Sequence, residues 1–341
     1  MNIWEAIMRL MKQRKTMKNN LAKYIESTWE TLKSEGVSTM MKVEESKAPI
    51  YLRANDQTVA FLLTIDAQRE IDIKSQQYSN VNISIEKLSS NTKGIVVTLT
   101  NHRFYEIFTM IATDIISKTM LLDIETEYLA MYCLKIHSWR NMFSRIPQQL
   151  LTAEEQLGLY GELEFIKTLI SEGVSIYDAV NAWRGADAEE KDFQFHNIGV
   201  EIKSSQKSDK LVKISNIRQL DTLGYNQLYL YYYSFAKSNS GDNTLPIQIE
   251  SLRAILEGSP FIEEFELKLL NIGYYDADKE NYTASYTLVN EEAYCVNSEF
   301  PKIVTGNVMT AIIDAAYVVD LNACDDFIVT YNSLIENIKQ G

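Results

Sequence analysis

One stretch of the chain, QLYLYYYSF from Gln227 to Phe235, constrains the fold more than any other. Side chains alternate between the two faces of a strand, and here both faces would be apolar or aromatic. Such a strand is stable only where other elements cover it on both sides. We therefore expect it to be the central strand of a layered core that combines a sheet with helices.

Composition and length place the chain among globular proteins. Its 341 residues allow a sizeable core and two or three domains. No apolar run approaches the roughly 18 residues of a membrane helix, and Glu5 and Arg9 interrupt the apolar N-terminal stretch, unlike in a secretory signal. Three widely spaced cysteines, Cys133, Cys295 and Cys324, indicate reduced thiols rather than a zinc site. We expect a cytoplasmic protein without a membrane partner.

Four parts follow one another along the chain. Residues 1–36 have the pattern of an amphipathic basic helix region, and 37–145 hold short runs rich in Ile, Val and Thr before a helical end, which predicts a β-rich N-terminal domain. Residues 150–240 have the order of an α/β core. Residues 241–341 contain 17 acidic and 5 basic residues, and we expect an accessory region packed on that core.

Local signals define the elements of the third part. Thr152 to Glu155 form a capping box, so a helix should begin there and end near Gly173. The stretch DFQFHNIGVEIKSS, residues 192–205, predicts a hairpin with its turn at residues 197–199. A short helix over KISNIRQLDTL, residues 213–223, is expected next, with Ser215 as its cap.

The hairpin carries an unusual set of charges. Alternation places Asp192 on one face of its first strand, and Glu201 with Lys203 on the polar face of the second. If the strands pair, two carboxylates and one ammonium share a face. A wet face of solvated charges is the alternative interpretation, because an E-x-K triplet alone is common.

The order of these pieces resembles the PD-(D/E)XK nuclease superfamily, and more narrowly the bacterial PD-(D/E)XK motif proteins. The matching segments are GLYGELEF (158–165), AWRG (182–185), DF (192–193), VEIKSS (200–205), RQL (218–220), YCVNSEFPKI (294–303) and AAYVVDL (315–321). The resemblance implies an α/β fold, α+β overall, with a restriction-endonuclease-like mixed-sheet core flanked by helices. It also implies the β-rich N-terminal domain and an accessory acidic C-terminal part.

The resemblance assigns catalytic roles to Asp192, Glu201 and Lys203, and with less weight to Glu162. Magnesium takes one or two carboxylates and completes its shell with water and substrate oxygens. Asp192 and Glu201 could bind Mg²⁺, or Mn²⁺ in its place, with the Ile202 backbone carbonyl as a third ligand. Lys203 could orient the attacking water and stabilise the transition state. Glu162 could bind water around the metal or a second metal.

Further residues are candidates for DNA contact or for plain structural roles. The candidates for DNA binding are Arg184, Ser204, Lys207, Lys210, Lys213, Arg218 and Gln219. Solvated surface charge is the alternative for each basic residue. Leu223 stands where an exonuclease-like Gln-x-x-x-Tyr motif would need tyrosine, which favours an endonuclease. His196 is expected at the surface, and Trp183 in packing.

Two functions of different kinds therefore remain. The first is a magnesium-dependent DNA endonuclease of restriction or phage-defence type that acts as a homodimer, because two-fold symmetry suits the cutting of both strands. The second is a catalytically silent nuclease-fold subunit that binds DNA or a protein partner, such as a methyltransferase or ATPase. The acidic charge favours the second function, and the joint presence of Asp192, Glu201 and Lys203 favours the first.

Overall fold

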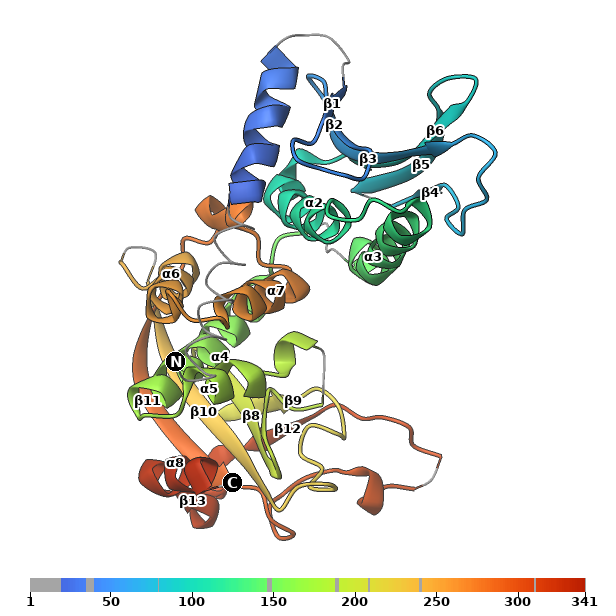
Figure 1. Cartoon of the computed structure of the whole chain (residues 1–341). Coiled ribbons are helices and arrows are strands. Elements are labelled where there is room, and N and C mark those ends of the chain that lie inside the picture. Colours follow the sequence, from blue (N-terminus) through green and yellow to red (C-terminus); the bar gives the residue numbers. More distant parts are fainter. Residues whose placement is uncertain are drawn as a thin grey trace, which may run out of the picture. The chain divides into compact units, whose positions relative to one another are not determined.

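The structure, a computed structural model, describes residues 20–34, 40–78, 80–145, 149–187, 190–207, 209–238, 241–309 and 311–340. The chain divides into two compact units, Met1–Pro147 and Gln148–Gly341, and each is described by itself (Figure 1). The helix expected over residues 1–36 is described only at 20–34, where the chain is helical, so its basic residues before Asn20 lie outside the described residues. None of the described helices is long and apolar enough to span a membrane.

The first unit is an antiparallel sheet with helices packed on it. The described strands follow the order β1-β2-β3-β6-β5-β4. Their bounds are β1 Met40–Lys42, β2 Ile50–Ala54, β3 Val59–Asp66, β4 Gln76–Gln77, β5 Val81–Lys87 and β6 Thr92–Leu99. The helices α2 (Tyr105–Thr119) and α3 (Glu125–Arg145) follow. Four runs rich in Ile, Val and Thr therefore form β2, β3, β5 and β6, as predicted.

Aromatic side chains join the sheet of the first unit to its helices. Phe61 on β3 contacts Phe108 on α2 and Tyr132 on α3, with ring centroids 5.5 and 6.2 Å apart. Trp29 stacks on Phe108 at 5.6 Å, and its indole N–H donates to the Ala60 carbonyl at 3.0 Å. The buried ring of Trp29 thus has both an apolar partner and a hydrogen-bond acceptor, as a buried indole requires.

The second unit is built on a mixed sheet. Its described strands follow the order β13-β11-β10-β8-β7, in which β8 and β10 are parallel and the other pairs are antiparallel. Their bounds are β7 Phe193–Phe195, β8 Ile198–Ser205, β10 Gln227–Ser238, β11 Ser285–Cys295 and β13 Ile328–Val329. The predicted fold class, an α+β protein with a mixed-sheet core, is confirmed.

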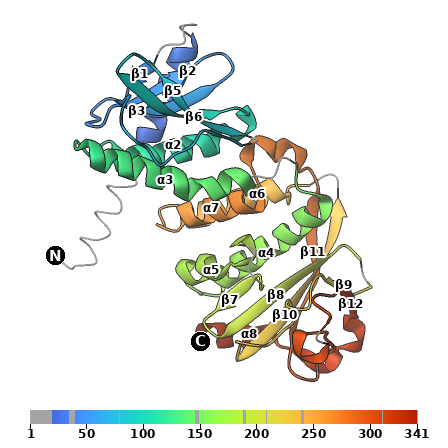
Figure 2. The same cartoon turned by 90° about the vertical axis from the view of Figure 1, so that its right-hand side faces the viewer.

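Strand β10 is central and buried on both faces, as its sequence predicts. Tyr231 and its neighbours at odd positions face a core that contains α4 (Ala153–Ser171) and α5 (Ile176–Ala182). Tyr232 and its neighbours at even positions face β9 (Leu211–Ile214) and β12 (Tyr317–Asp320), an antiparallel two-stranded ribbon. Figure 2 shows α4 and α5 on one side of the sheet and the ribbon on the other.

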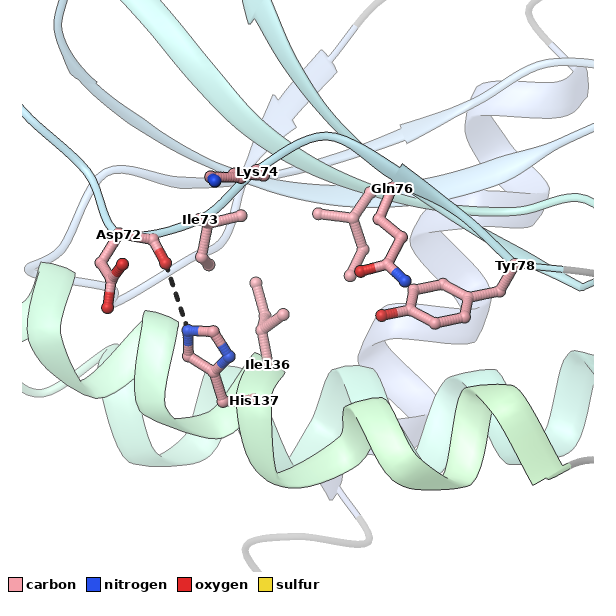
Figure 3. A pocket seen from close by; sticks show the side chains of 8 residues that line it. Asp72, Ile73, Lys74, Gln76, Tyr78, Ile136 and His137 are labelled. Carbon is pink, nitrogen blue, oxygen red and sulfur yellow. Dashed lines mark hydrogen bonds between the residues drawn. The ribbon is translucent and has the colours of Figure 1, made fainter.

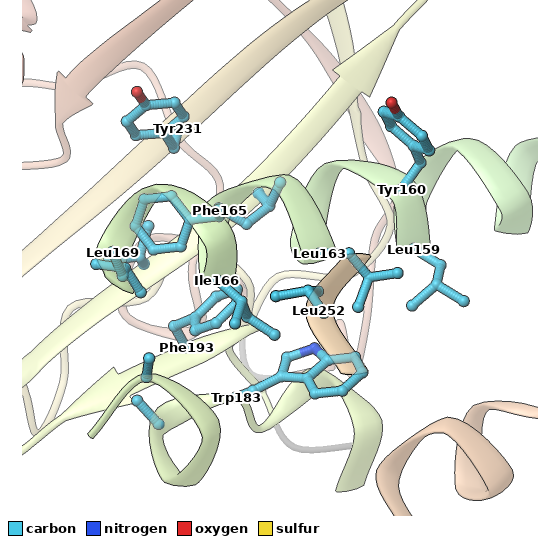
Figure 4. Packing of buried hydrophobic residues seen from close by; sticks show 14 of the residues in the cluster. Leu159, Tyr160, Leu163, Phe165, Ile166, Leu169, Trp183, Phe193, Tyr231 and Leu252 are labelled. Atoms are coloured by element: carbon cyan, nitrogen blue, oxygen red, sulfur yellow. The ribbon is translucent and has the colours of Figure 1, made fainter. Parts of the chain in front are cut away.

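Helix α4 supplies much of the packing on its side of the sheet (Figure 4). Thr152 caps its N-terminus in a capping box with Glu155, as predicted. Phe165 contacts the rings of Phe193 and Tyr231, with centroids 4.9 and 5.1 Å away. Because Phe193 belongs to β7 and Tyr231 to β10, one aromatic side chain ties both strands to the helix.

The acidic C-terminal part contributes strands to the central sheet. Strand β11 pairs with β10 from Ser285 to Cys295, and β13 extends the sheet beyond β11. The remaining helices of this part are α6 Leu245–Leu256, α7 Ile262–Ile272 and α8 Tyr331–Gln340. Residues 241–341, which we expect to be an accessory region, therefore include strands that complete the sheet.

Two local predictions are wrong. Residues 213 and 214 end strand β9 and residues 217–220 form turns, in place of the helix expected over 213–223. The alternating burial of β9 and its pairing with β12 override the helical signal. The hairpin turn lies at His196 and Asn197, with His196 at a φ of 46°, so that Ile198 and Gly199 belong to β8.

Gly161 allows α4 to lie close to β8. A Cβ atom at this position would lie 2.0 Å from the Ser204 hydroxyl oxygen and 3.3 Å from its Cβ. Gly158, one turn earlier in the same helix, has nothing within 4 Å of such an atom. The two glycines differ in crowding but share the same helix.

This difference predicts that Gly161→Ala destabilises the protein relative to Gly158→Ala. Both substitutions gain helix propensity of about 1 kcal/mol, but crowding at Gly161 should cost about 1–3 kcal/mol. Urea unfolding of the two variants measures the difference directly. Equal free energies of unfolding would contradict the close packing of α4 on β8.

Candidate active site

The centre of the candidate site is a buried ion pair on β8. Lys203 Nζ lies 2.9 Å from Glu201 Oε1, and the two side chains are 14% and 1% exposed. Glu201 is beside Leu230 of β10, so it points to the face covered by the β9 and β12 ribbon. The predicted polar face of this strand is thus inside the protein, and both oxygens of Glu201 are buried without a well-aligned hydrogen bond from any described residue.

Asp192 lies at the edge of β8, just before β7 begins. Its Oδ2 accepts a hydrogen bond from the Ile202 backbone N–H at 2.7 Å. The Asp192 carbonyl accepts from the N–H groups of Arg184 and Gly185 at 2.7 and 3.0 Å. The Asp192 side chain therefore accepts the Ile202 N–H that no residue of β7 pairs with. This contact holds Asp192 beside both Glu201 and Lys203.

The Ile202 carbonyl points to the same edge. The N–H and C=O groups of one strand residue face the same side. Because the Ile202 N–H reaches Asp192, its carbonyl oxygen lies on the same edge of β8. The hairpin thus gathers two carboxylates and one main-chain oxygen.

Glu162 approaches from α4. Its Oε2 accepts a hydrogen bond from the indole N–H of Trp183 at 2.6 Å. The ring of Trp183 is fully buried and packs against Phe265, with centroids 5.9 Å apart. The predicted packing role of Trp183 therefore comes with a second one, because the indole fixes the Glu162 carboxylate.

Gly185 lies close against two of the carboxylates. A Cβ atom at this position would lie 3.0 Å from Asp192 Oδ1 and 3.0 Å from Glu162 Oε2. The two oxygens thus face one point from which a side chain is missing. Glycine allows this close approach, because any other residue would place its Cβ there.

Gln219 holds the ammonium of the pair from the other side. Its Oε1 accepts from Lys203 Nζ at 3.2 Å and from the Ser215 N–H at 2.7 Å. The sequence suggested a DNA contact for Gln219, and the structure shows its amide oxygen directed to Lys203. The Lys203 ammonium has three donors. Its contacts with Glu201 and Gln219 use two of them.

Burial raises the pKa of all three carboxyl groups, and repulsion by Asp192 adds to the shift at Glu201 and Glu162. Burial and the Asp192 charge raise the pKa of Glu201 to about 8, although Lys203 opposes the shift. Burial and Asp192 also raise the pKa of Glu162, and burial raises that of Asp192 against the pull of Lys203. Burial alone would lower the pKa of Lys203, but Glu201 and Asp192 outweigh it and raise the value. The cluster is short of positive charge.

These residues fit a hard divalent cation. Carboxylate and carbonyl oxygens are the ligands that magnesium prefers, and one or two carboxylates suffice. Both oxygens of Glu201 are buried and lack a well-aligned hydrogen bond from a described residue, and this favours a bound cation. In the described part of the chain, no group of three or more His, Cys, Asp and Glu side chains is placed to hold a metal ion. A cation here would need main-chain, water or substrate oxygens besides the carboxylates.

The residues predicted to bind DNA differ in exposure and in the partners they contact. Lys207 and Lys213 are exposed. Lys210 forms an ion pair with Glu292 at 2.7 Å, and Arg218 lies 3.7 Å from Glu190. Arg184 is half-buried where its N–H holds Asp192.

Ser204 requires a correction. Its hydroxyl oxygen is buried against Gly161 of α4, so it cannot reach DNA in this structure. The E-x-K-S-S order alone cannot reveal this, because the approach of α4 decides which side chain is covered. His196, by contrast, is exposed in the hairpin turn as expected.

Sequence reasoning missed three contributors to the site. The sequence predicts only packing for Trp183, gives Gly185 only as part of AWRG, and assigns no role to Lys191. A glycine in the segment before a carboxylate-bearing hairpin is a signal for close approach, but the sequence does not show which group approaches it.

A hollow of about 270 Å³ lies in the first unit, apart from this set of residues (Figure 3). It is lined by three isoleucines and by five polar side chains. These are Ile73, Ile83 and Ile136, and Asp72, Lys74, Gln76, Tyr78 and His137. The His137 ring nitrogen Nε2 lies 3.2 Å from the Asp72 carbonyl oxygen. This hollow has no cluster of carboxylates with a lysine.

Comparison with known proteins identifies the family of the chain. A family model described as "Putative PD-(D/E)XK family member, (DUF4420)" matches residues 25–322. The match includes every residue assigned to the site, and it confirms the resemblance drawn from the motifs. Searches of curated proteins and of solved structures found no match.

The raised pKa values predict that the metal-free protein loses stability as the pH rises. A carboxyl group with a higher pKa in the folded than in the unfolded chain stabilises the fold fully below the unfolded value, here 4.5 for Glu201, and no longer does so above the folded value of about 8. Glu201→Gln should remove the pH-dependent contribution of this carboxyl group to stability. The melting temperature of the variant should therefore fall by several degrees less between pH 5 and pH 9 than that of the unmodified protein. Calorimetry with a chelator checks this.

Glu257→Gln is the matched control, because it removes the same charge at an exposed position. Its melting curve should follow that of the unmodified protein at each pH. Parallel pH profiles for Glu201→Gln and the unmodified protein would show that Glu201 does not titrate abnormally.

Proposed function

Because the chain belongs to the PD-(D/E)XK-type family whose model it matches, we propose that it is a magnesium-dependent DNA endonuclease of restriction or phage-defence type. One observation carries the proposal. Lys203 is ion-paired with Glu201 beside Asp192 at the edge of β8, and the described residues leave both oxygens of Glu201 without a well-aligned hydrogen bond. This is a set of ligands and a point charge suited to phosphodiester hydrolysis.

The chain's own residues have separate tasks in this proposal. Asp192 and Glu201, with the Ile202 carbonyl, would hold Mg²⁺ or Mn²⁺, and Glu162 would bind water near it or a second ion. Nucleases of the PD-(D/E)XK type generally use divalent metals. A bound ion would polarise the phosphate and make water a stronger nucleophile.

Lys203 would act on the phosphate and the attacking water. Its third donor is not engaged by a described residue, so it can donate to a water or to a phosphate oxygen. An ammonium held rigidly by Glu201 and Gln219 needs little reorganisation to stabilise charge that develops on the phosphate. DNA itself would contact exposed cations, of which Lys207 and Lys213 are candidates.

Assembly follows from the proposed reaction. One site per chain cuts one strand, so two copies related by two-fold symmetry would cut both. We propose a homodimer, and a methyltransferase or ATPase of a defence system as a further partner.

One set of contacts favours the alternative of a silent subunit. Lys210 and Arg218 lie beside acidic side chains, and the last 101 residues carry 17 acidic against 5 basic residues. Such a surface repels DNA more than it attracts it. A partner that supplies cations would then be needed for DNA binding.

Cleavage of unmodified plasmid DNA with Mg²⁺ or Mn²⁺ tests the proposal. Lys203→Ala and Asp192→Asn should each lower the rate at least about 100-fold. Asparagine keeps an oxygen that can accept from Ile202, so the fold contact survives while the charge is lost. Lys237→Ala, which removes an exposed lysine from β10, is the charge control and should cut at the normal rate. Undiminished cleavage by both folded site variants would refute this site.

A second experiment tests the close approach of Gly185 to the carboxylates. Gly185→Ala places a methyl group 3.0 Å from an oxygen of Asp192 and of Glu162, so it should weaken Mn²⁺ binding at least about 10-fold. Titration calorimetry measures this without DNA. Gly158→Ala, with open space around the new methyl, should bind Mn²⁺ normally. Equal affinities for the two variants would place the ion elsewhere.

A further inference from the structure

Lys191 is a buried cation that stands directly before Asp192. Its side chain is 2% exposed, although lysine is almost never fully buried unless paired. Its ammonium lies 5.3 Å from the centre of the Tyr225 ring and close enough to Glu201 and Asp192 to interact electrostatically. Burial of such a group requires compensation, and its surroundings show where that compensation comes from.

The ammonium of Lys191 is tied to the turn after β9. Its Nζ donates a hydrogen bond to the Arg218 carbonyl oxygen. The same carbonyl accepts from the Asp221 N–H at 3.1 Å, which closes the turn. Lys191 therefore fastens residues 215–221 to the edge where Asp192 begins the hairpin.

That turn carries Gln219, the residue next to Arg218. The amide oxygen of Gln219 receives both Lys203 Nζ and the Ser215 N–H. Two buried lysines thus hold one turn from two directions, Lys191 through the main chain and Lys203 through the side chain of Gln219. A shift of the turn would move the acceptor of Lys203.

We propose that Lys191 is a positioning residue for Lys203, acting through Arg218 and Gln219; this rests on the proposed nuclease function. Lys191 keeps the turn in place, Gln219 then keeps its oxygen at Lys203, and the ammonium stays between Glu201 and Gln219. The effect on the reaction would be indirect, because Lys191 Nζ donates to the main chain and not to a site carboxylate.

The test compares Lys191→Met, which keeps the length of the side chain, with Lys191→Gln, which keeps a donor but no charge. Hydrogen exchange should rise in residues 215–221 of Lys191→Met by at least about 10-fold, with little change elsewhere in the unit. Cleavage should fall about 10- to 100-fold in kcat with KM nearly unchanged. In Lys191→Gln, the rise in hydrogen exchange and the fall in kcat should both be smaller than in Lys191→Met.

A double-mutant cycle shows whether Lys191 acts through Gln219. On a Gln219→Leu background, Lys191→Met should cost no more than about 2-fold in further activity, because the acceptor that it positions is already gone. Lys93→Met is the matched control. It removes a lysine that donates to the Arg69 carbonyl at 2.6 Å in the first unit, so cleavage should stay within about 2-fold.

The outcomes separate the two proposals. Unmodified protein that cuts no DNA would end the nuclease proposal, while the exchange measurement would still decide whether Lys191 holds the turn. Unchanged exchange in residues 215–221 of folded Lys191→Met would overturn the role of Lys191. Fully additive effects of Lys191→Met and Gln219→Leu on the rate of cleavage would also overturn this role. Lys191 would then act on stability or on another part of the site.

Discussion

The burial of Glu201 beside Lys203 is the interaction on which the rest of the site depends. A carboxylate that is 1% exposed is strongly unfavourable unless charge and hydrogen bonds offset its desolvation. One ammonium offsets part of this, yet three carboxyl groups share the region and their pKa values are all raised. The fold thus buries three carboxyl groups that are costly to ionise together, and a bound cation would favour their ionised forms.

The surrounding architecture explains how this charge is kept from water. Helix α4 approaches one face of β8 through Gly161, and the ribbon of β9 and β12 covers the other. The short strand β7 begins only at Phe193, so the edge of β8 beside Ile202 is left to the Asp192 side chain. A longer β7 would pair with Ile202 and remove the place where the carboxylates meet.

Several elements could be predicted because their signals are local. The capping box at Thr152, the alternation of the hairpin and the double-sided burial of Tyr231 and Tyr232 each depend on a few neighbouring residues. The helix expected over residues 213–223 failed because its real partner, β12, lies about 100 residues later. Likewise Ser204 was offered as a DNA contact, but contact with α4 buries its hydroxyl. Long-range packing outweighed local preference in both cases.

By itself, the sequence determined which chemical groups the site can use and roughly where the strands and helices begin. Two-residue alternation places Asp192, Glu201 and Lys203 on polar faces, and the resemblance to PD-(D/E)XK nucleases is what assigns them to a site. The tertiary structure alone decided that Glu201 is buried, that Gly185 lies close against Asp192 and Glu162, and that Lys191 and Gln219 hold the same turn. These properties depend on elements distant in sequence, since desolvation and contact arise only when those elements pack together.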